Sequence, residues 1–236
     1  LLSTYNLGDF LNALPVLSGI YKTNGKFDFI ILDEMKRING IREFLMYQNI
    51  FSSVEFSGNT TITTESFIAL SSWTREDRNS IHRPIETCRY ENWIRDNYSK
   101  LEFEVDDDFI LKIDDNLEID ICDSCYGGDR WAGPNIDTRR KSWTLNHLTG
   151  IKWLDYNNTI MHNAYLIKNS KKPFISTFTG ISVLADLLNK EQFVLWGEDI
   201  RDWDNKPISY SFEKHYYMNR NSKLLSINDF EKKYYD

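Results

Sequence analysis

Residues 174–199 constrain the fold of this chain more than any other segment. Their pattern predicts a strand, a tight turn, a helix and a second strand, at residues 174–177, 178–180, 181–189 and 192–197. The run 193–196 is apolar throughout, which is typical of a strand buried on both faces. A strand that enters a helix through a Ser/Thr/Gly turn gathers free backbone N–H groups and the positive helix end at one place, which suits a phosphate group. The alternative is an ordinary βαβ unit in which Thr179 only caps the helix.

A second informative segment covers residues 7–15, Leu-Gly-Asp-Phe-Leu-Asn-Ala-Leu-Pro. Gly8 permits positive φ or a close backbone approach where a strand turns into a helix. Asp9 opens a predicted helix over residues 9–21, in which an interior Pro15 would cost about 3 kcal/mol. We therefore expect Pro15 either to kink this helix or to mark a short first turn before a longer segment. Two roles are open to Asp9, as an N-cap or as a base that points into a cleft.

Together the two segments resemble the heptosyltransferase family, the ADP-heptose-dependent glycosyltransferases of the GT-B fold. The positions that carry the resemblance are residues 8–15, 164–167, 174–177, 179–185 and 194–197. The chain departs from the family at Val183, where the family has His, and at Phe178, where it has Asp or Ser. Both departures affect side-chain contacts with the donor, whereas a phosphate cradle at residues 179–180 uses backbone groups. The resemblance therefore implies the fold and a diphosphate site, and it leaves the nucleotide, the sugar and the acceptor open.

The expected fold class is α/β, and the resemblance implies the GT-B arrangement of two Rossmann-like parallel-sheet domains that face a cleft. Acidic clusters at residues 106–108 and 114–116 bracket a short apolar run and mark the expected boundary. The N-terminal, acceptor-side domain would cover residues 1–113, and the C-terminal, nucleotide-sugar-binding domain residues 114–236. Further strands are expected at residues 1–5, 27–32, 53–56, 67–71, 117–122 and 151–154, and further helices at residues 37–47 and 228–235.

Glycosyl transfer from a nucleoside diphosphate sugar needs a base for the acceptor hydroxyl and N–H donors or positive charge for the leaving diphosphate. Asp9 is the predicted base. The predicted donor-binding residues are Gly8, Arg130, Asp155, Thr179, Gly180 and Ser182. Arg130 is the nearest equivalent of a Lys that the family places close to a Trp, and its alternative role is that of a surface Arg beside a packed Trp. Asp155 would accept a ribose hydroxyl.

The predicted reaction needs no metal ion. An Asp-X-Asp motif at the end of a strand would indicate a metal-dependent GT-A enzyme, but residues 106–108 precede a predicted strand. The helix end and Arg130 would take the place of the cation, and no cofactor is expected beside the nucleotide-sugar donor. Inversion at the anomeric carbon by direct displacement fits a single base, and the resemblance implies the same stereochemistry.

Composition indicates a folded, soluble protein, because a chain of 236 residues with 41% hydrophobic residues can bury a large core. No apolar run approaches the roughly 18 residues needed to cross a bilayer, so we expect a cytoplasmic protein without integral membrane contact. The three cysteines, Cys88, Cys122 and Cys125, cannot all pair with one another, which fits a reducing compartment. Cys122 and Cys125 form a lone CxxC motif, which we interpret as two half-buried thiols at a strand end rather than as a metal site.

The acceptor is expected near residues 74–100, a region of mixed helix and loop, with Arg75 and Arg78 as acceptor-binding residues. A hydroxymethylated DNA base, as in a bacteriophage-type enzyme, is favoured by these arginines and by the many Asn and few Ala residues, which are typical of AT-rich genomes. The net charge of −7 opposes a DNA acceptor and leaves a saccharide or lipid-linked acceptor as the alternative. Further alternatives are a nucleotide-sugar epimerase or hydrolase and a noncatalytic nucleotide-binding module.

Overall fold

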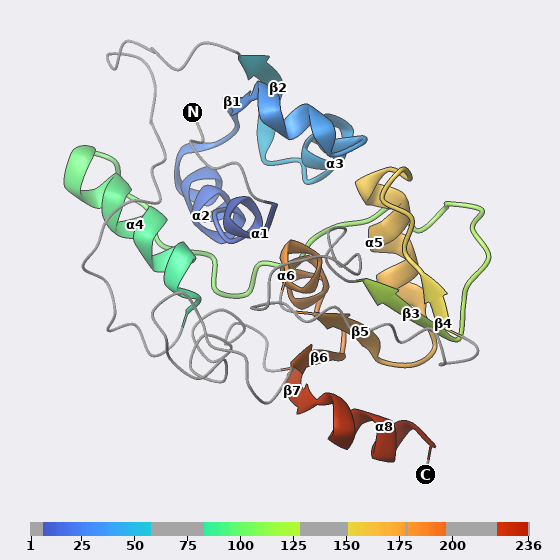
Figure 1. Cartoon of the computed structure of the whole chain (residues 1–236). Coiled ribbons are helices and arrows are strands. Elements are labelled where there is room, and N and C mark those ends of the chain that lie inside the picture. The colour runs from blue at the N-terminus through green and yellow to red at the C-terminus, as the bar shows by residue number, and fades with distance from the viewer. Residues whose placement is uncertain (1–6, 58–82, 128–150, 178, 197–220, 236) are drawn as a thin grey trace.

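The computed structural model describes residues 7–57, 83–127, 151–177, 179–196 and 221–235, and Figure 1 shows their course from the N-terminus in blue to the C-terminus in red. The described chain is α/β, with one sheet of two parallel strands and one sheet of five parallel strands. This architecture is compatible with a Rossmann-like fold. The expected strands at residues 1–5 and 67–71 lie outside the described residues. None of the described helices has the length and apolarity that a bilayer-spanning helix requires.

The larger sheet has the strand order β4-β3-β5-β6-β7. Its strands are β3 (Ser124–Gly127), β4 (Ile151–Trp153), β5 (Phe174–Thr177), β6 (Gln192–Trp196) and β7 (Ser222–Ser226). The first of these strands along the chain lies between the second and the third, so the chain extends the sheet from β3 to one side and then, from β5 onward, to the other. The carboxyl ends of β3 and β5 therefore form a topological switch point, the place where open parallel sheets bind their ligands.

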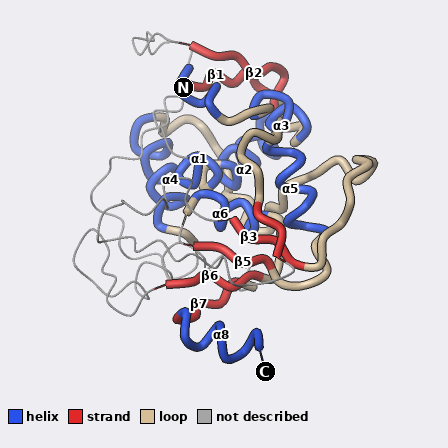
Figure 2. Tube along the Cα trace, turned by 45° about the vertical axis from the view of Figure 1, so that its right-hand side comes forward, coloured by secondary structure: helices blue, strands red, loops and turns tan. Residues whose placement is uncertain are grey.

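Helices cover both faces of this sheet (Figure 2). They are α5 (Ile160–Asn169), α6 (Gly180–Leu187) and α8 (Ile227–Tyr235). Side chains alternate between the faces, since Phe174 and Val194 pack in the larger core cluster with α5 and α6, whereas Ile175 and Leu195 pack with Phe230 of α8. Residues 181–187 of α6 are all buried, because α6 lies between the sheet and the N-terminal helix α1.

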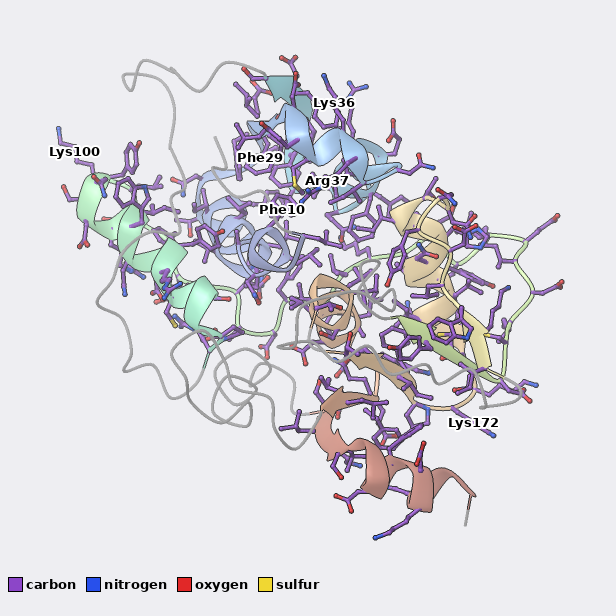
Figure 3. The ribbon with its side chains drawn as sticks, viewed as in Figure 1. Phe10, Phe29, Lys36, Arg37, Lys100 and Lys172 are labelled. Carbon is purple, nitrogen blue, oxygen red and sulfur yellow. The ribbon has the colours of Figure 1, made fainter. Side chains whose placement is uncertain are left out.

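The N-terminal half surrounds the smaller parallel sheet. Its elements are α1 (Leu7–Leu11), α2 (Leu14–Asn24), β1 (Phe27–Leu32), the 3-10 helix η1 (Asp33–Arg37), α3 (Ile41–Tyr47), β2 (Phe51–Ser57) and α4 (Ile85–Asn97). The rings of Phe10 and Phe29 stack with their centroids 6.2 Å apart, and Figure 3 shows both in the interior between α1 and β1. Phe29 also stacks on Phe51 of the neighbouring strand at 4.7 Å, so aromatic packing joins α1 to the sheet.

Two predicted helices differ from the observed ones because of a proline and a glycine. The expected helix over residues 9–21 is divided into α1 and α2, and Pro15 lies in the first turn of α2, where its missing N–H removes no helical hydrogen bond. This confirms the expectation of a short first turn before a longer segment. The expected helix over residues 37–47 begins only at Ile41, because Gly40 precedes it in the left-handed conformation with φ 73°.

The predicted strand at residues 117–122 is wrong. Leu117 and Ile119 pack against the core, while Ile121 is 50% exposed, so the alternation of apolar and acidic residues follows the surface rather than a sheet. Residues 98–123 contain neither helix nor strand, and the first strand of the larger sheet begins at Ser124. The sequence pattern had predicted no strand at the position of β7.

The larger core cluster contains side chains from both predicted domains. The connecting segment, residues 98–123, packs closely on α2, since a Cβ atom on Gly19 would lie only 1.8 Å from the carbonyl oxygen of Glu104. Within this segment, Oδ2 of Asp106 accepts a hydrogen bond from Oγ of Ser18, and Oδ1 of Asp106 forms an ion pair with Nζ of Lys22, both at 2.6 Å. The N–H of Leu111 donates to the carbonyl of Leu187 in α6 at 2.9 Å. The connecting segment thus joins α2 to α6.

Candidate functional site

The candidate site lies at the carboxyl edge of the larger sheet, around the switch point. We call it the carboxyl-edge site, and its residues are Gly127, Trp153, Thr177, Thr179 and Gly180. The register aligns the strand ends at this edge, because Tyr126 pairs with Trp153 of β4 and Gly127 pairs with Ser176 of β5. Three strand ends and the first turn of α6 therefore converge at one edge of the sheet.

An aromatic pair lies at the β4 side of this site. Trp153 is 48% exposed, and its ring meets the ring of Tyr126 edge to face, with centroids 4.4 Å apart and an interplanar angle of 63°. Tyr126 is buried, and its ring packs against the ring of Trp153. An exposed, supported indole ring offers a flat apolar surface on which a nucleobase or a sugar ring can stack.

A buried hydroxyl group lies at the end of β5. The Oγ1 atom of Thr177 is inaccessible to solvent and, among the described residues, has no hydrogen-bond partner. Thr177 lies two positions after Ile175 in the strand, so both project on the α8 side of the sheet, the side of Tyr126. An unpaired buried hydroxyl costs about 1–3 kcal/mol, so a group of this kind calls for a partner such as a ligand oxygen or a water molecule.

The first turn of α6 is closed by its own side chain. The N–H of Thr179 donates to Oγ of Ser182 at 3.1 Å, and Oγ of Ser182 donates to the carbonyl of Thr179 at 2.5 Å. Ser182 is fully buried. The Ser182 hydroxyl, which we expected to hold a phosphate oxygen, therefore caps the helix in this structure. The N–H of Ser182 donates to the carbonyl of Thr179 at 3.0 Å, so within the first turn the N–H groups of Gly180 and Ile181 are those without a partner among the described residues.

The starts of α1 and α6 are in direct backbone contact (Figure 1). A Cβ atom on Gly180 would lie 2.7 Å from the backbone nitrogen of Gly8, and a Cβ atom on Gly8 would lie 3.1 Å from Cα of Gly180. Both positions need glycine for this approach. The two segments that carry the family resemblance therefore meet. We expected a phosphate cradle at residues 179–180, but among the described residues the group nearest to Gly180 is the backbone of Gly8.

Asp155 follows β4 at the same edge of the sheet. Its side chain is exposed, and Oδ1 accepts a hydrogen bond from the N–H of Asn157 at 2.8 Å, which fixes the turn that leads into α5. The predicted base, Asp9, lies in α1 directly after Gly8, and the placement of its side chain lies outside what the structure describes. The predicted residues Arg75, Arg78 and Arg130 also lie outside the described residues.

A polar network supports α6 from the side of the sheet. Gln192 of β6 donates from Nε2 to the carbonyl of Ser182 and to Oγ of Ser222, both at 2.8 Å, and the Ser222 hydroxyl donates to Oδ1 of Asp186 at 2.9 Å. Asp186 is 3% exposed, and its burial raises the pKa of the carboxyl group to about 7, against the opposing effect of the Ser222 hydrogen bond. The network connects the first turn of α6 to β6 and β7.

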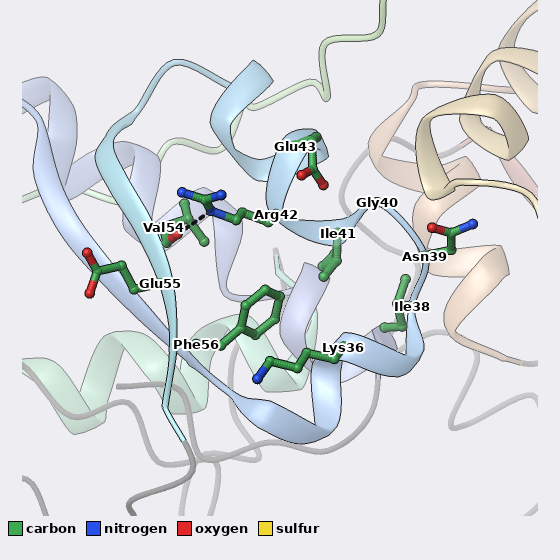
Figure 4. Close-up of a pocket in the computed structure, with 10 residues that line it drawn as sticks. All are labelled: Lys36, Ile38, Asn39, Gly40, Ile41, Arg42, Glu43, Val54, Glu55 and Phe56. Carbon is green, nitrogen blue, oxygen red and sulfur yellow. Dashed lines mark hydrogen bonds between the residues drawn. The ribbon is translucent and has the colours of Figure 1, made fainter.

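A pocket of about 490 Å³ opens in the N-terminal half (Figure 4). We call it the η1–α3 pocket, and its lining residues are Lys36, Ile38, Asn39, Gly40, Ile41, Arg42, Glu43, Val54, Glu55 and Phe56. Nζ of Lys36 lies 5.2 Å from the centre of the Phe56 ring. Nε of Arg42 donates to the carbonyl of Val54 at 2.8 Å, which holds the guanidinium group at the wall of the pocket.

The rim of the η1–α3 pocket contacts the loop that follows β4. Asn39 donates from Nδ2 to the carbonyl of Asn157 and accepts from the N–H of Ile160, both at 2.8 Å. Gly40 lies against Thr159, since a Cβ atom at Gly40 would be 2.9 Å from Cβ of that residue. The pocket of the N-terminal half and the carboxyl edge of the larger sheet are therefore joined through residues 155–160.

The described residues contain no group of three or more His, Cys, Asp and Glu side chains that could hold a metal ion. No family model, no curated protein and no solved structure matches the chain. The fold alone does not determine a function, because parallel α/β sheets serve many chemistries. The function is therefore argued from the geometry of the site.

Sequence reasoning missed Trp153, Thr177 and the η1–α3 pocket. A signal existed for the first two, because Thr177 ends a predicted strand and Trp153 lies one residue before the end of another, and strand ends at the carboxyl edge of parallel sheets are where such sheets bind ligands. The pocket had no comparable signal. It depends on η1, a 3-10 helix too short to produce a hydrophobic period, and on the contact of Asn39 with a distant loop.

Proposed function

We propose that this chain is a metal-independent glycosyltransferase of the GT-B type, which binds a nucleoside diphosphate sugar at the carboxyl-edge site. One observation carries the proposal. The two segments that resemble heptosyltransferase motifs are far apart in the sequence, and their glycines, Gly8 and Gly180, meet at the switch point of the larger sheet. A switch point is where parallel sheets bind nucleotides, and a helix N-terminus beside it favours a diphosphate.

The described residues suggest how the donor is held. The N–H groups of Gly180 and Ile181 at the start of α6 would bind diphosphate oxygens, and the hydroxyl of Thr177, which has no partner among the described residues, would donate to one of them. The half-exposed ring of Trp153 would stack on the nucleobase or the ribose. Arg130, which lies three residues after the end of β3 in the sequence and outside the described residues, would add the positive charge that stabilises the leaving diphosphate.

The proposed reaction is a single displacement. The Asp9 carboxylate takes the proton from an acceptor hydroxyl, and the acceptor oxygen forms a bond to the anomeric carbon of the sugar. The bond from that carbon to the diphosphate breaks, and the nucleoside diphosphate leaves with the bonding electron pair. One displacement inverts the anomeric carbon. A positioned general base typically contributes 10²–10⁴-fold to the rate.

The η1–α3 pocket favours a saccharide acceptor over DNA. Its lining combines two cations, Lys36 and Arg42, with two carboxylates, Glu43 and Glu55, and one aromatic ring, Phe56. Opposed charges and an aromatic face suit the hydroxyl groups and apolar ring face of a sugar, whereas a phosphate backbone selects a surface of uniform positive charge. Because the pocket rim contacts residues 155–160, an acceptor bound in this pocket would lie beside the edge that would bind the donor.

A noncatalytic nucleotide-binding module is the second candidate. It is favoured by the direct contact of Gly8 with Gly180, which leaves no space for a sugar between these two backbones. In that case Asp9 would act only in the first turn of α1, and the protein would bind a nucleotide without transferring a sugar.

The Asp9→Asn variant separates the two candidates. Uridine, adenosine, guanosine, cytidine and thymidine diphosphate sugars are offered with a core oligosaccharide and, separately, with hydroxymethylated DNA, and the released nucleoside diphosphate is measured. A transferase loses at least about 10²-fold in rate in Asp9→Asn and keeps its donor affinity and melting temperature. Asp28→Asn, at an exposed aspartate on β1, serves as the matched control. Donor binding without transfer on every acceptor would support the module instead.

A further inference from the structure

Cys122 and Cys125 lie at the amino end of β3, opposite the edge that contains the carboxyl-edge site. Cys122 is half-buried and reachable from solvent, whereas Cys125 is fully buried within the strand. Cys122 packs against the core cluster that contains Cys125, and the Cys125 thiol donates to the carbonyl oxygen of Leu166 at 3.7 Å. The CxxC motif thus combines one accessible sulfur with one enclosed sulfur three residues further along the chain.

The backbone of the motif is held in place by the loop that follows α5. The N–H of Lys171 donates to the carbonyl of Cys122 at 3.3 Å, and the N–H of Lys172 donates to the carbonyl of Asp123 at 2.8 Å; Figure 3 labels Lys172 in this loop. Nζ of Lys171 also pairs with Oδ1 of Asp123 at 2.7 Å. These contacts hold the backbone between the two cysteines in place.

The surroundings give the two thiols different protonation states. A hydrogen bond with Cys125 is the largest effect on Cys122, and the pKa of the Cys122 thiol is lowered to about 6. The charge of Lys152 also lowers this pKa, whereas partial burial and the charge of Asp123 raise it. The same hydrogen bond and its burial raise the pKa of Cys125 well above the ordinary thiol range. A thiolate is the nucleophile in disulfide exchange, so the accessible Cys122 is the reactive sulfur.

We propose that Cys122 and Cys125 form a reversible dithiol–disulfide couple that reacts with small-molecule disulfides, with Cys122 as the attacking thiol and Cys125 as the resolving thiol. The arrangement matches the requirement of such couples for one exposed nucleophile beside a second thiol. The couple does not depend on the proposed transferase activity, because it lies at the opposite edge of the sheet.

The chemistry balances with oxidised glutathione as the oxidant. The Cys122 thiolate attacks one sulfur of that disulfide, the sulfur–sulfur bond breaks, and one glutathione thiolate leaves and takes up a proton. The Cys125 thiol then loses its proton and attacks the Cys122 sulfur of the mixed disulfide, which expels the second glutathione. Two protein thiols are oxidised to one disulfide, and one glutathione disulfide is reduced to two thiols.

The experiment equilibrates the full chain in buffers of reduced and oxidised glutathione, blocks remaining thiols with N-ethylmaleimide and measures intact and peptide masses. Wild type should lose two alkylation sites in the peptide that contains residues 122–125. Cys125→Ser should accumulate a glutathionyl group on Cys122, and Cys122→Ser should leave Cys125 unmodified. Cys88→Ser is the matched control and should behave as wild type, because Cys88 is buried in α4, far along the chain.

A second measurement needs only the wild-type protein. The rate of Cys122 alkylation by iodoacetamide should reach half its maximum near pH 6 rather than near the ordinary thiol value of about 8.5. At pH 7 the rate should exceed that of free cysteine by only about threefold, because nucleophilicity falls with pKa. The proposal is overturned if wild type forms no internal disulfide at any glutathione ratio, or if the half-maximal rate lies at the ordinary thiol value.

Discussion

At the scale of single residues, the buried carboxyl group of Asp186 has a direct consequence for stability. Burial raises its folded pKa to about 7, while an unfolded Asp titrates near 3.9. Between about pH 4 and about pH 7 the carboxyl group of Asp186 is therefore protonated in the native state and ionised in the unfolded state. The stabilising contribution is complete below about pH 4 and is lost as the pH rises through 7, because the ionised carboxylate must then remain in the core.

We expect Asp186→Asn to remove this pH dependence. Asn has nearly the same shape and no charge, so the variant should be more stable than wild type by about 2–4 kcal/mol at pH 8. At pH 4 the difference should vanish or reverse. Urea denaturation across this range provides the measurement. Asp229→Asn is the matched control, because exposed Asp229 accepts a comparable hydrogen bond from Ser226. Parallel stability curves for wild type and Asp186→Asn would contradict the account.

At the scale of elements, the contact between α1 and α6 decides how the two halves pack. A Cβ atom on Gly180 would meet the backbone nitrogen of Gly8, an atom that cannot move aside without shifting α1. A Cβ atom on Gly8 would lie 3.1 Å from Cα of Gly180, a longer distance than the 2.7 Å from a Cβ atom on Gly180 to the nitrogen of Gly8. The approach of the helices is therefore more sensitive to a side chain at Gly180.

We predict that Gly180→Ala destabilises the ligand-free protein by about 1–3 kcal/mol, and Gly8→Ala by less. Without the contact, Ala would instead stabilise a helical position by up to about 1 kcal/mol relative to Gly. Thermal denaturation of both variants without nucleotide makes the comparison. An unchanged or raised stability in Gly180→Ala, combined with weakened nucleotide binding, would show that Gly180 serves the ligand rather than the packing of α1 on α6.

The elements that the sequence predicts well are those with a local period. The ranges of β1 and β5 are as predicted, and α6 and β6 agree within two residues at each end, because apolar stripes and runs mark them. The start of β3 was misplaced, since residues 117–121 alternate as in a strand but form none: Leu117 and Ile119 pack against the core from a loop, and Ile121 is exposed. The contact of Gly8 with Gly180 has no local signal, because it depends on how distant elements pack.

At the scale of the whole molecule, the net charge and the acceptor are linked. A chain with net charge −7 binds DNA only through a local basic surface. The predicted contacts, Arg75 and Arg78, would have to provide it, whereas the η1–α3 pocket carries opposed charges. The two acceptors therefore differ in their response to salt.

We expect transfer to a saccharide to change little as salt rises from about 50 to 200 mM, a range over which a protein with several phosphate contacts loses orders of magnitude in affinity. The Arg75→Ala/Arg78→Ala double variant should leave saccharide transfer nearly unchanged. A steep salt dependence on hydroxymethylated DNA, with a slope that falls by about one for each arginine removed, would establish the DNA acceptor instead. Donor affinity, measured in parallel, serves as the control.

The central claim is that the carboxyl-edge site binds a nucleoside diphosphate. Calorimetric titration of the five common nucleoside diphosphates and their bare nucleosides, into wild type, Trp153→Ala and Thr177→Val, tests it most directly. The account predicts that at least one diphosphate binds. Trp153→Ala should weaken the diphosphate and its nucleoside alike, by about tenfold for one lost stacking contact. Thr177→Val should weaken only the diphosphate, by about fivefold for one lost hydrogen bond. Thr23→Val, in α2, should change neither. Diphosphate binding that both site variants leave intact, or no binding of any nucleoside diphosphate, would contradict the account.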